Sequence, residues 1–428
     1  MQLLKNSAII AIFGIISQVM GLVRDRLLAS HIGIGATLDI YYMSFRVADF
    51  IYAIILAFVG AVTILPIISK YVAEKNEAEV SRRFNSIFFF FSISITILSA
   101  IAFILTPYFV KIYSSNLDFD SVQTLIIMSR ILLLQPIILG ISNIVSVLSQ
   151  AHKHFMIFSI APLFYNMGII LGVIFFYEKH GIYGLAYGVV LGAIAHLLVQ
   201  SITIWKAKFN FKFIMDMSVI KVELSLAGPR SVALLLQQSR IIVMNIFAGY
   251  FGVGVLSVFI FATTLAALPL QFFGVSFAVA SFPKMSEMFE LKDEDGFKGL
   301  AKKSIFNLTW ISILVSFLCI LFAQLIARLV YGDIARIESV VVMFAVLCLA
   351  IPFQTVNWFA TRVFYARRDS WSPLLAQIAA FSVTIGVLYA CYVNGIGSMS
   401  LVYATVIGCV AESLLLFSLY IKKSQKML

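Results

Sequence analysis

Long apolar stretches recur along the whole chain, and this feature restricts the fold more than any other. A helix needs about 20 apolar residues to cross a bilayer, and only helices or closed barrels satisfy their backbone hydrogen bonds there. Twelve stretches reach that length, at about residues 6–27, 37–64, 86–110, 122–149, 156–177, 183–205, 226–249, 254–281, 304–328, 338–361, 373–393 and 398–421. The sequence therefore predicts an all-α polytopic membrane protein with about 12 transmembrane helices.

Composition supports a membrane protein. Of the 428 residues, 61% are hydrophobic and 12% are charged, whereas soluble domains contain about 25% charged residues. The net charge of +11 is typical of cytoplasmic loops beside anionic lipids, so we expect membrane lipids and no nucleic acid as partners. Lys5 precedes an apolar helix that has no signal-peptide cleavage site. We therefore expect this helix to be retained. The four cysteines lack metal-ligand spacing, so we expect free thiols and no metal site.

Basic residues are distributed unevenly between the loops on the two sides of the predicted helices. With the N-terminus inside, the inner segments carry 21 lysines and arginines and the outer segments carry 6. Cytoplasmic loops are enriched in these residues. The asymmetry predicts that both termini are cytoplasmic.

Short motifs occur twice along the chain. LLASHIGIG at 27–35 matches IFAGYFGVG at 246–254, and each lies between the first two helices of its half. Four further matches follow in order: Pro66 with Pro283, Pro136 with Pro352, Pro162 with Pro373, and Gly181 with Gly395. We expect two six-helix lobes, 1–222 and 223–428, related as parallel repeats around a central cavity. This arrangement is typical of transporters with a substrate site between the lobes.

One segment, 21–49, concentrates charge between two apolar runs. Its charged residues are Arg24, Asp25, Arg26, Asp39, Arg46 and Asp49. Each would cost about 3 kcal/mol in a lipid-facing helix, so we expect them to face each other or water. Helical spacing places Asp39, Arg46 and Asp49 on one face. The segment predicts a polar wall that lines a cavity; the alternative is an internal salt-bridge network that only fixes helix packing.

The same segment resembles the opening of the MurJ/MviN family of proposed lipid II flippases, within the multidrug/oligosaccharidyl-lipid/polysaccharide exporter superfamily. The shared residues are Gly21, Arg24, Asp25, Gly33, Gly35, Thr37, Asp39, Tyr41, Tyr42, Phe45 and Arg46. The similarity extends over essentially the whole chain, including Ala161-Pro162 followed by Asn166. The resemblance implies a flippase for peptidoglycan biosynthesis, and hence for cell-wall biogenesis and cell shape, in the bacterial cytoplasmic membrane.

Three departures from the family pattern concern the substrate. The family usually carries an arginine and a glutamate where this chain has Tyr52 and Ala57, and an arginine in the eighth helix near Thr264. Typical members also continue for two helices beyond the twelfth span. A smaller set of cations must therefore bind an anionic substrate, or the substrate differs from lipid II.

The implied substrate, a polyprenyl-diphosphate-linked sugar, needs cations inside the membrane. Arginine donates to phosphate oxygens in pairs and stays charged. We expect substrate contacts from Arg24, Arg26, Arg46 and Arg240. We expect four acids to hold these arginines or to couple transport to a cation: Asp25, Asp39, Asp49 and Glu412. No cofactor and no catalytic residue are expected, coupling to sodium, protons or the membrane potential remains open, and the expected state is a monomer.

Other function classes remain open at this stage. An exporter of another polyprenyl-linked oligosaccharide would use the same cations. A multidrug exporter would favour a net acidic cavity for cationic drugs. A membrane enzyme acting on lipid-linked sugars would need a catalytic acid or base in an outer loop, where the acidic residues form no recognisable constellation.

Overall fold

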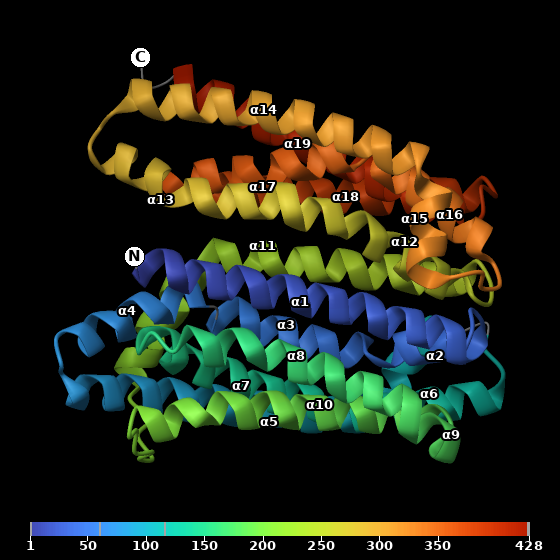
Figure 1. Cartoon of the computed structure of the whole chain (residues 1–428), viewed down its shortest axis with the longest axis horizontal. Helices are drawn as coiled ribbons and strands as arrows, with labels where there is room; N and C mark the ends of the chain where they lie inside the picture. The colour runs from blue at the N-terminus through green and yellow to red at the C-terminus, as the bar shows by residue number, and fades with distance from the viewer. Residues whose placement is uncertain (1, 60, 115–116, 426–428) are drawn as a thin grey trace. The chain divides into compact units, whose positions relative to one another are not determined.

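The computed structural model describes residues 2–59, 61–114 and 117–425. Every regular element within these ranges is helical. The chain forms two compact units, Met1–Ser231 and Val232–Leu428. Within each unit the long helices run lengthwise beside one another (Figure 1).

The first unit begins with a long helix and a broken one. Its elements are α1 Gln2–His31, α2 Ala36–Ser44, α3 Arg46–Val59, α4 Ala61–Ala73, α5 Glu77–Tyr113, α6 Phe119–Leu132, α7 Leu134–Ala151, α8 Phe155–Leu171, the π-helical turn η1 Gly172–Phe176, α9 Tyr177–His180 and α10 Ile182–Lys206. The next helix, α11 Met217–Tyr250, crosses the boundary between the units and is kinked at Gly228, where φ is 22° and ψ is −129°.

The second unit continues from α11. Its further elements are α12 Val255–Pro269, the π-helical turn η2 Leu270–Val275, α13 Ser276–Glu290, α14 Glu294–Leu321, α15 Ala323–Tyr331, α16 Ile337–Cys348, α17 Ile351–Ala366, α18 Trp371–Val393 and α19 Met399–Gln425.

All twelve predicted spans fall on helices. Within the described ranges, nine helices are long and apolar enough to cross a membrane, and the bent pair α16–α17 makes ten if it forms one span. The predicted spans at 6–27 and 37–64 are outside this count. The second of them begins in α2, which is 9 residues long, and continues after the turn at Phe45 into α3; residue 60, which follows α3, lies outside the described residues. The prediction of an all-helical membrane protein is confirmed.

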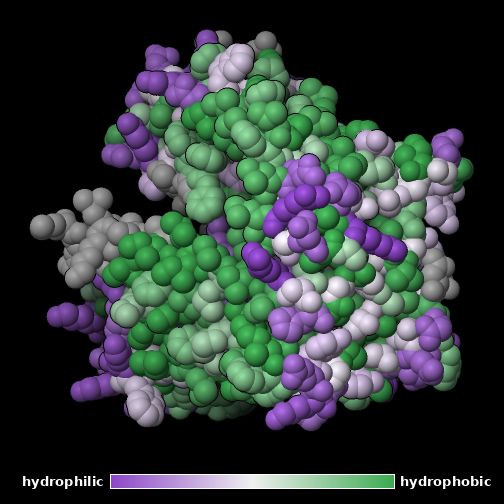
Figure 2. All heavy atoms as spheres, turned by 45° about the vertical axis from the view of Figure 1, so that its right-hand side comes forward, coloured by the Kyte–Doolittle hydropathy of each residue, from purple (hydrophilic) through white to green (hydrophobic). Residues whose placement is uncertain are grey.

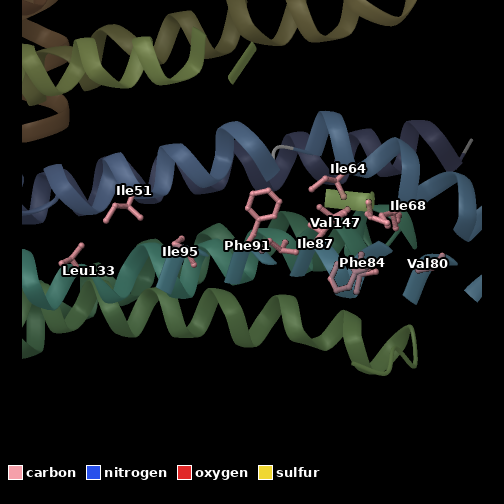
Figure 3. Packing of buried hydrophobic residues seen from close by; sticks show 14 of the residues in the cluster. Ile51, Ile64, Ile68, Val80, Phe84, Ile87, Phe91, Ile95, Leu133 and Val147 are labelled. Carbon is pink, nitrogen blue, oxygen red and sulfur yellow. The ribbon is translucent and has the colours of Figure 1, made fainter. Parts of the chain in front are cut away.

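Apolar side chains from successive helices form the core of the first unit. Ile51 of α3, Ile64 of α4, Phe91 of α5 and Val147 of α7 belong to one buried cluster (Figure 3). In the space-filling view, hydrophobic residues form broad surfaces and hydrophilic residues gather in separate groups (Figure 2). Broad exposed apolar surfaces mark contact with lipid or with partner proteins.

Glycines allow α8 and α10 to approach closely. A Cβ atom added to Gly188 would lie 2.5 Å from the Cα of Gly172, and one added to Gly168 would lie 2.2 Å from the Cα of Gly192. Small residues permit such backbone contact between membrane helices. This contact fixes the position of α8, which carries part of the site described below.

The duplicated sequence has matching turns in the two halves. Lys75 (φ 55°) and Lys292 (φ 59°) both adopt left-handed backbone conformations. Each precedes an N-cap whose side chain accepts a backbone hydrogen bond: Asn76 caps α5 and Asp293 caps α14. The turns that follow the matched prolines Pro66 and Pro283 therefore have similar local structure.

Candidate functional site

Arg24, on α1, lies at the centre of the first polar site. Its Nε donates to Asp25 Oδ1 at 2.8 Å, and its Nη1 donates to Asn166 Oδ1 at 3.2 Å. The Asp25 side chain is 2% exposed, whereas that of Arg24 is 28% exposed. The guanidinium is thus held on two sides, and the side chain as a whole remains partly exposed.

Asn166 of α8 forms hydrogen bonds with two residues of α1, Arg24 and Ser17. Its Nδ2 donates to the backbone oxygen and the hydroxyl of Ser17, both at 3.3 Å. The amide is therefore oriented with its oxygen towards Arg24. The sequence identified Asn166 only through the family resemblance, because its contact with Arg24 links residues 142 positions apart.

The other predicted charges of the first unit lie on α1, α2 and α3. Arg46 Nη1 lies 4.0 Å from Asp49 Oδ2, one helical turn along α3. The Asp39 side chain is buried, and Arg26 is exposed on α1. The cluster therefore contains two sequence-local ion pairs, Arg24–Asp25 and Arg46–Asp49. This pairing fits both alternatives, a cavity wall and a packing network.

One position where the family usually carries charge is occupied by a neutral hydrogen-bonded group. The Tyr52 hydroxyl accepts a hydrogen bond from Asn143 Nδ2 at 2.5 Å. In α12, Thr264 lies near the position where the family usually carries an arginine, and the hydroxyl of its neighbour Thr263 donates to the carbonyl of Ile260 at 2.9 Å.

A buried polar site in the second unit involves Arg240 of α11 and Glu412 of α19. Arg240 Nη1 lies 4.0 Å from Glu412 Oε2, and their side chains are 19% and 8% exposed. Gln377 of α18 donates to Glu412 Oε1 at 2.7 Å. The sequence predicted functions for Arg240 and Glu412 separately. It did not identify Gln377, which stands in the sequence only as a single amide in an apolar run.

A second layer of polar groups surrounds this pair. Asn357 of α17 donates to the carbonyl of Cys409 at 3.1 Å and accepts from the Ser413 hydroxyl at 2.6 Å. Gln354 donates to Cys409 Sγ at 3.4 Å. Buried polar networks of this kind fix side-chain orientation when their groups are satisfied. Across the described part of the chain, no group of three or more His, Cys, Asp or Glu residues could hold a metal ion.

The connector between α10 and α11, residues 207–216, lies against α5. Aromatic pairs join them, with ring centroids 4.8–5.0 Å apart: Phe84–Phe209, Phe88–Phe211 and Phe89–Phe213. Arg82 of α5 pairs with Asp216 at 2.5 Å. Hydrogen bonds from Ser218 and Arg82 hold the pKa of the Asp216 carboxyl below its usual range. The connector is therefore fixed to the first unit at both its aromatic and its charged positions.

Comparison with known proteins decides the family. A family model described as lipid II flippase MurJ matches residues 28–428. The chain belongs to the MurJ family. This is a family of flippase transporters rather than enzymes, so the predicted family and the predicted absence of enzymatic activity are confirmed.

Individual MurJ relatives are distant. The chain is 25% identical over 299 residues to a probable lipid II flippase MurJ of Buchnera aphidicola, covering 68% of this chain and 58% of that protein. It is 24% identical over 393 residues to the Borreliella burgdorferi protein of that description, covering 87% and 74%. With the lipid II flippase MurJ of Burkholderia cenocepacia, the identity is 22% over 432 residues, covering 97% and 83%.

Solved structures show the MurJ fold. A lipid II flippase MurJ in an inward closed conformation matches with a TM-score of 0.83 at 19% identity, covering 96% of this chain and 87% of that one. An inward-facing multidrug-resistance transporter of the MATE family matches with a TM-score of 0.80 at 17% identity, covering 96% and 95%. The fold is thus shared by MurJ and MATE transporters.

Proposed function

We propose that this protein flips a polyprenyl-diphosphate-linked sugar, lipid II or a close relative, across the bacterial cytoplasmic membrane. The family match supports a flippase. The observation that supports an anionic substrate is the Arg24 side chain, which remains 28% exposed while its guanidinium is held by Asp25 and Asn166. Its fork donates to phosphate oxygens in pairs, so it can bind the diphosphate.

In this proposal the first-unit cations act together. Arg24 exchanges its neutral partner Asn166 for a phosphate oxygen while Asp25 keeps the guanidinium in place. Arg46 and Arg26 supply further positive charge, and Asp39 and Asp49 balance it when no substrate is bound. Because the sugar headgroup is large and hydrated, it needs a polar path through the lipid core.

We assign Arg240 and Glu412 to the second half of the transport cycle. Arg240 supplies a cation to the diphosphate, and Glu412 holds it in the empty state or takes up a proton or sodium ion. Transport then proceeds by alternating access between two lobes, 1–222 and 223–428, with both termini in the cytoplasm. A monomer is sufficient for this scheme.

The test is flipping of labelled lipid by the purified protein in proteoliposomes. Headgroup accessibility to an impermeant reagent is compared for lipid II and for another polyprenyl-diphosphate oligosaccharide. The proposal expects transport of at least one of them by the wild type and none by Arg24→Ala. Arg328→Gln is the matched control, because Arg328 forms exposed ion pairs with Asp333 and Glu338. Equal transport by the wild type and Arg24→Ala would contradict the assignment of Arg24.

A further inference from the structure

A groove of about 780 Å³ lies between α5 and the α6–α7 helices of the first unit. Its size falls within the range of about 300–1,000 Å³ typical of small-molecule sites. Phe103 and Ile104 of α5 and Leu134 of α7 line it, and these side chains are 47%, 69% and 49% exposed. The groove is therefore apolar and accessible from the side of the helices.

Arg130 is the single charged residue in this lining. Its Nε donates to the carbonyl of Phe103 at 3.3 Å, and its guanidinium carbon lies 4.8 Å from the centroid of the Phe103 ring. Among the described residues it forms no ion pair with a carboxylate. A cation beside lipid without an anionic partner is costly, so the position favours an anionic ligand.

Helix lengths place Arg130 near one edge of the hydrocarbon core. The α5 helix has 37 residues and the α6–α7 span has 33, so at about 1.5 Å per residue both exceed a core of about 30 Å by roughly 20 Å. Phe103 is about 15 Å from the end of α5, and Arg130 is about 17 Å from the start of α6. Helical side chains lean towards the N-terminus, which directs Arg130 towards the interface beside the α5–α6 connection.

The other lining residues lie deeper along the groove. Ser99 is one turn of α5 below Phe103, and Ile137 lies two turns of α6–α7 beyond Arg130. The Ser99 side chain is 2% exposed, and its hydroxyl has no hydrogen-bond partner among the described residues. From the interface inwards, the groove therefore presents a cation and then an apolar channel, with the Ser99 hydroxyl buried in its wall.

This order matches the phosphate and acyl chain of a membrane lipid. We propose that the groove binds a monoanionic phospholipid, with its phosphate on Arg130 and one acyl chain along Leu134 and Ile137. A guanidinium binds the phosphate through charge-assisted hydrogen bonds. A zwitterionic lipid brings its own ammonium group to the phosphate, so it should bind less tightly.

The proposed lipid is distinct from the transported substrate. The groove is formed by α5, α6 and α7, whereas the Arg24 site is formed by α1 and α8. The inference does not depend on the proposed function. With the predicted topology, the bound lipid belongs to the outer leaflet.

Native mass spectrometry of the full-length protein tests this site. The protein is purified in detergent micelles that contain either phosphatidylglycerol or phosphatidylcholine, and retained lipid is measured. The wild type should retain phosphatidylglycerol preferentially. Arg130→Gln should reduce that retention about tenfold or more, since a hydrogen bond to a charged group is lost. Arg130→Lys should be intermediate because lysine keeps the charge without the planar fork.

Two further variants separate the headgroup from the chain. Ala100→Phe, which fills the groove at an exposed lining position, should reduce retention of both lipids. Lys111→Gln removes an exposed cation from the last turn of α5 outside the groove, and should leave retention unchanged. Equal retention of both lipids by the wild type, or unchanged retention in Arg130→Gln or Ala100→Phe, would overturn the proposal. So would displacement of phosphatidylglycerol by a lipid-linked diphosphate, which would assign the groove to the substrate.

Discussion

Arg24 and Asn166 are joined by a 3.2 Å hydrogen bond between α1 and α8. The bond pairs a charged donor with a neutral acceptor, while the carboxylate of Asp25 contacts the same guanidinium at 2.8 Å. A neutral acceptor is easier to replace by an anionic ligand than a carboxylate is. If a phosphate binds here, we therefore expect it to replace Asn166 rather than Asp25 as a partner of Arg24.

Substitution at Arg24 and Asn166 should affect transport differently. We expect Arg24→Ala to abolish lipid flipping, because each lost hydrogen bond to phosphate is worth about 1.5–3 kcal/mol. Arg24→Lys should restore flipping only partly. Asn166→Ala should lower the rate without abolishing it, since Asn166 positions the guanidinium. The proteoliposome flipping assay measures all three, and full activity of Arg24→Ala would show that the residue is structural.

Variants of the Arg240–Glu412 pair can distinguish a role in helix packing from a role in substrate binding. Arg240→Gln leaves the buried Glu412 carboxylate without its cation, so we expect unfolding to become easier by about 1–3 kcal/mol. The double variant Arg240→Gln/Glu412→Gln removes both charges and should recover most of that stability. Thermal unfolding in detergent measures this recovery.

Lipid binding by the same double variant completes the test. If Arg240 contacts the substrate, the stable double variant should still bind lipid-linked diphosphate more weakly than the wild type. Wild-type affinity in the double variant would assign Arg240 to helix packing alone.

Much of the fold was predictable because it depends on local properties of the sequence. Apolar length predicted helices at all twelve spans. Spacing along one helix likewise predicted that Arg46 and Asp49 share a face, and their side chains lie 4.0 Å apart. Such contacts need only the helical repeat.

The remainder of the candidate sites depends on long-range packing. Gln377 reaches Glu412 from another helix, 35 positions away, and no periodic pattern relates the two. The turn at Phe45, between α2 and α3, also interrupts one continuous apolar prediction. The sequence did not predict a site at Arg130, because a lone arginine in an apolar run gives no indication of the groove beside it.

Close glycine packing between α8 and α10 leads to a stability prediction with an internal control. Gly188→Ala would place a Cβ 2.5 Å from the Cα of Gly172, whereas Gly386→Ala meets nothing within 4 Å. We expect Gly188→Ala to destabilise the protein by about 1–3 kcal/mol through overpacking. Gly386→Ala should be neutral or stabilising by up to about 1 kcal/mol, since alanine favours helix. Thermal unfolding of both variants in detergent decides this, and equal stability would contradict the close packing.

Glu223 provides a prediction about pH. It lies on α11 before the candidate span Ser231–Tyr250, is 1% exposed, and its carboxyl oxygens have no hydrogen-bond partner among the described residues. Burial raises the pKa of Glu223 from 4.5 to about 7, although the charge of Arg83 opposes the shift. Between these values the folded state binds more protons than the unfolded state. Ionisation of Glu223 therefore lowers the free energy of unfolding as the pH rises from 4.5 to about 7. This loss of stability persists at higher pH.

Glu223→Gln should remove this dependence. At pH 8 we expect the variant to be more stable than the wild type by about 1–3 kcal/mol, because a buried charge without a partner is lost. At pH 4 the carboxyl is largely protonated in both states, so the difference should be small. Glu178→Gln, at an exposed position of α9, is the matched control and should show no such change. Thermal unfolding at the two pH values tests this, and an equal effect of Glu223→Gln at both would mean that Glu223 does not titrate between them.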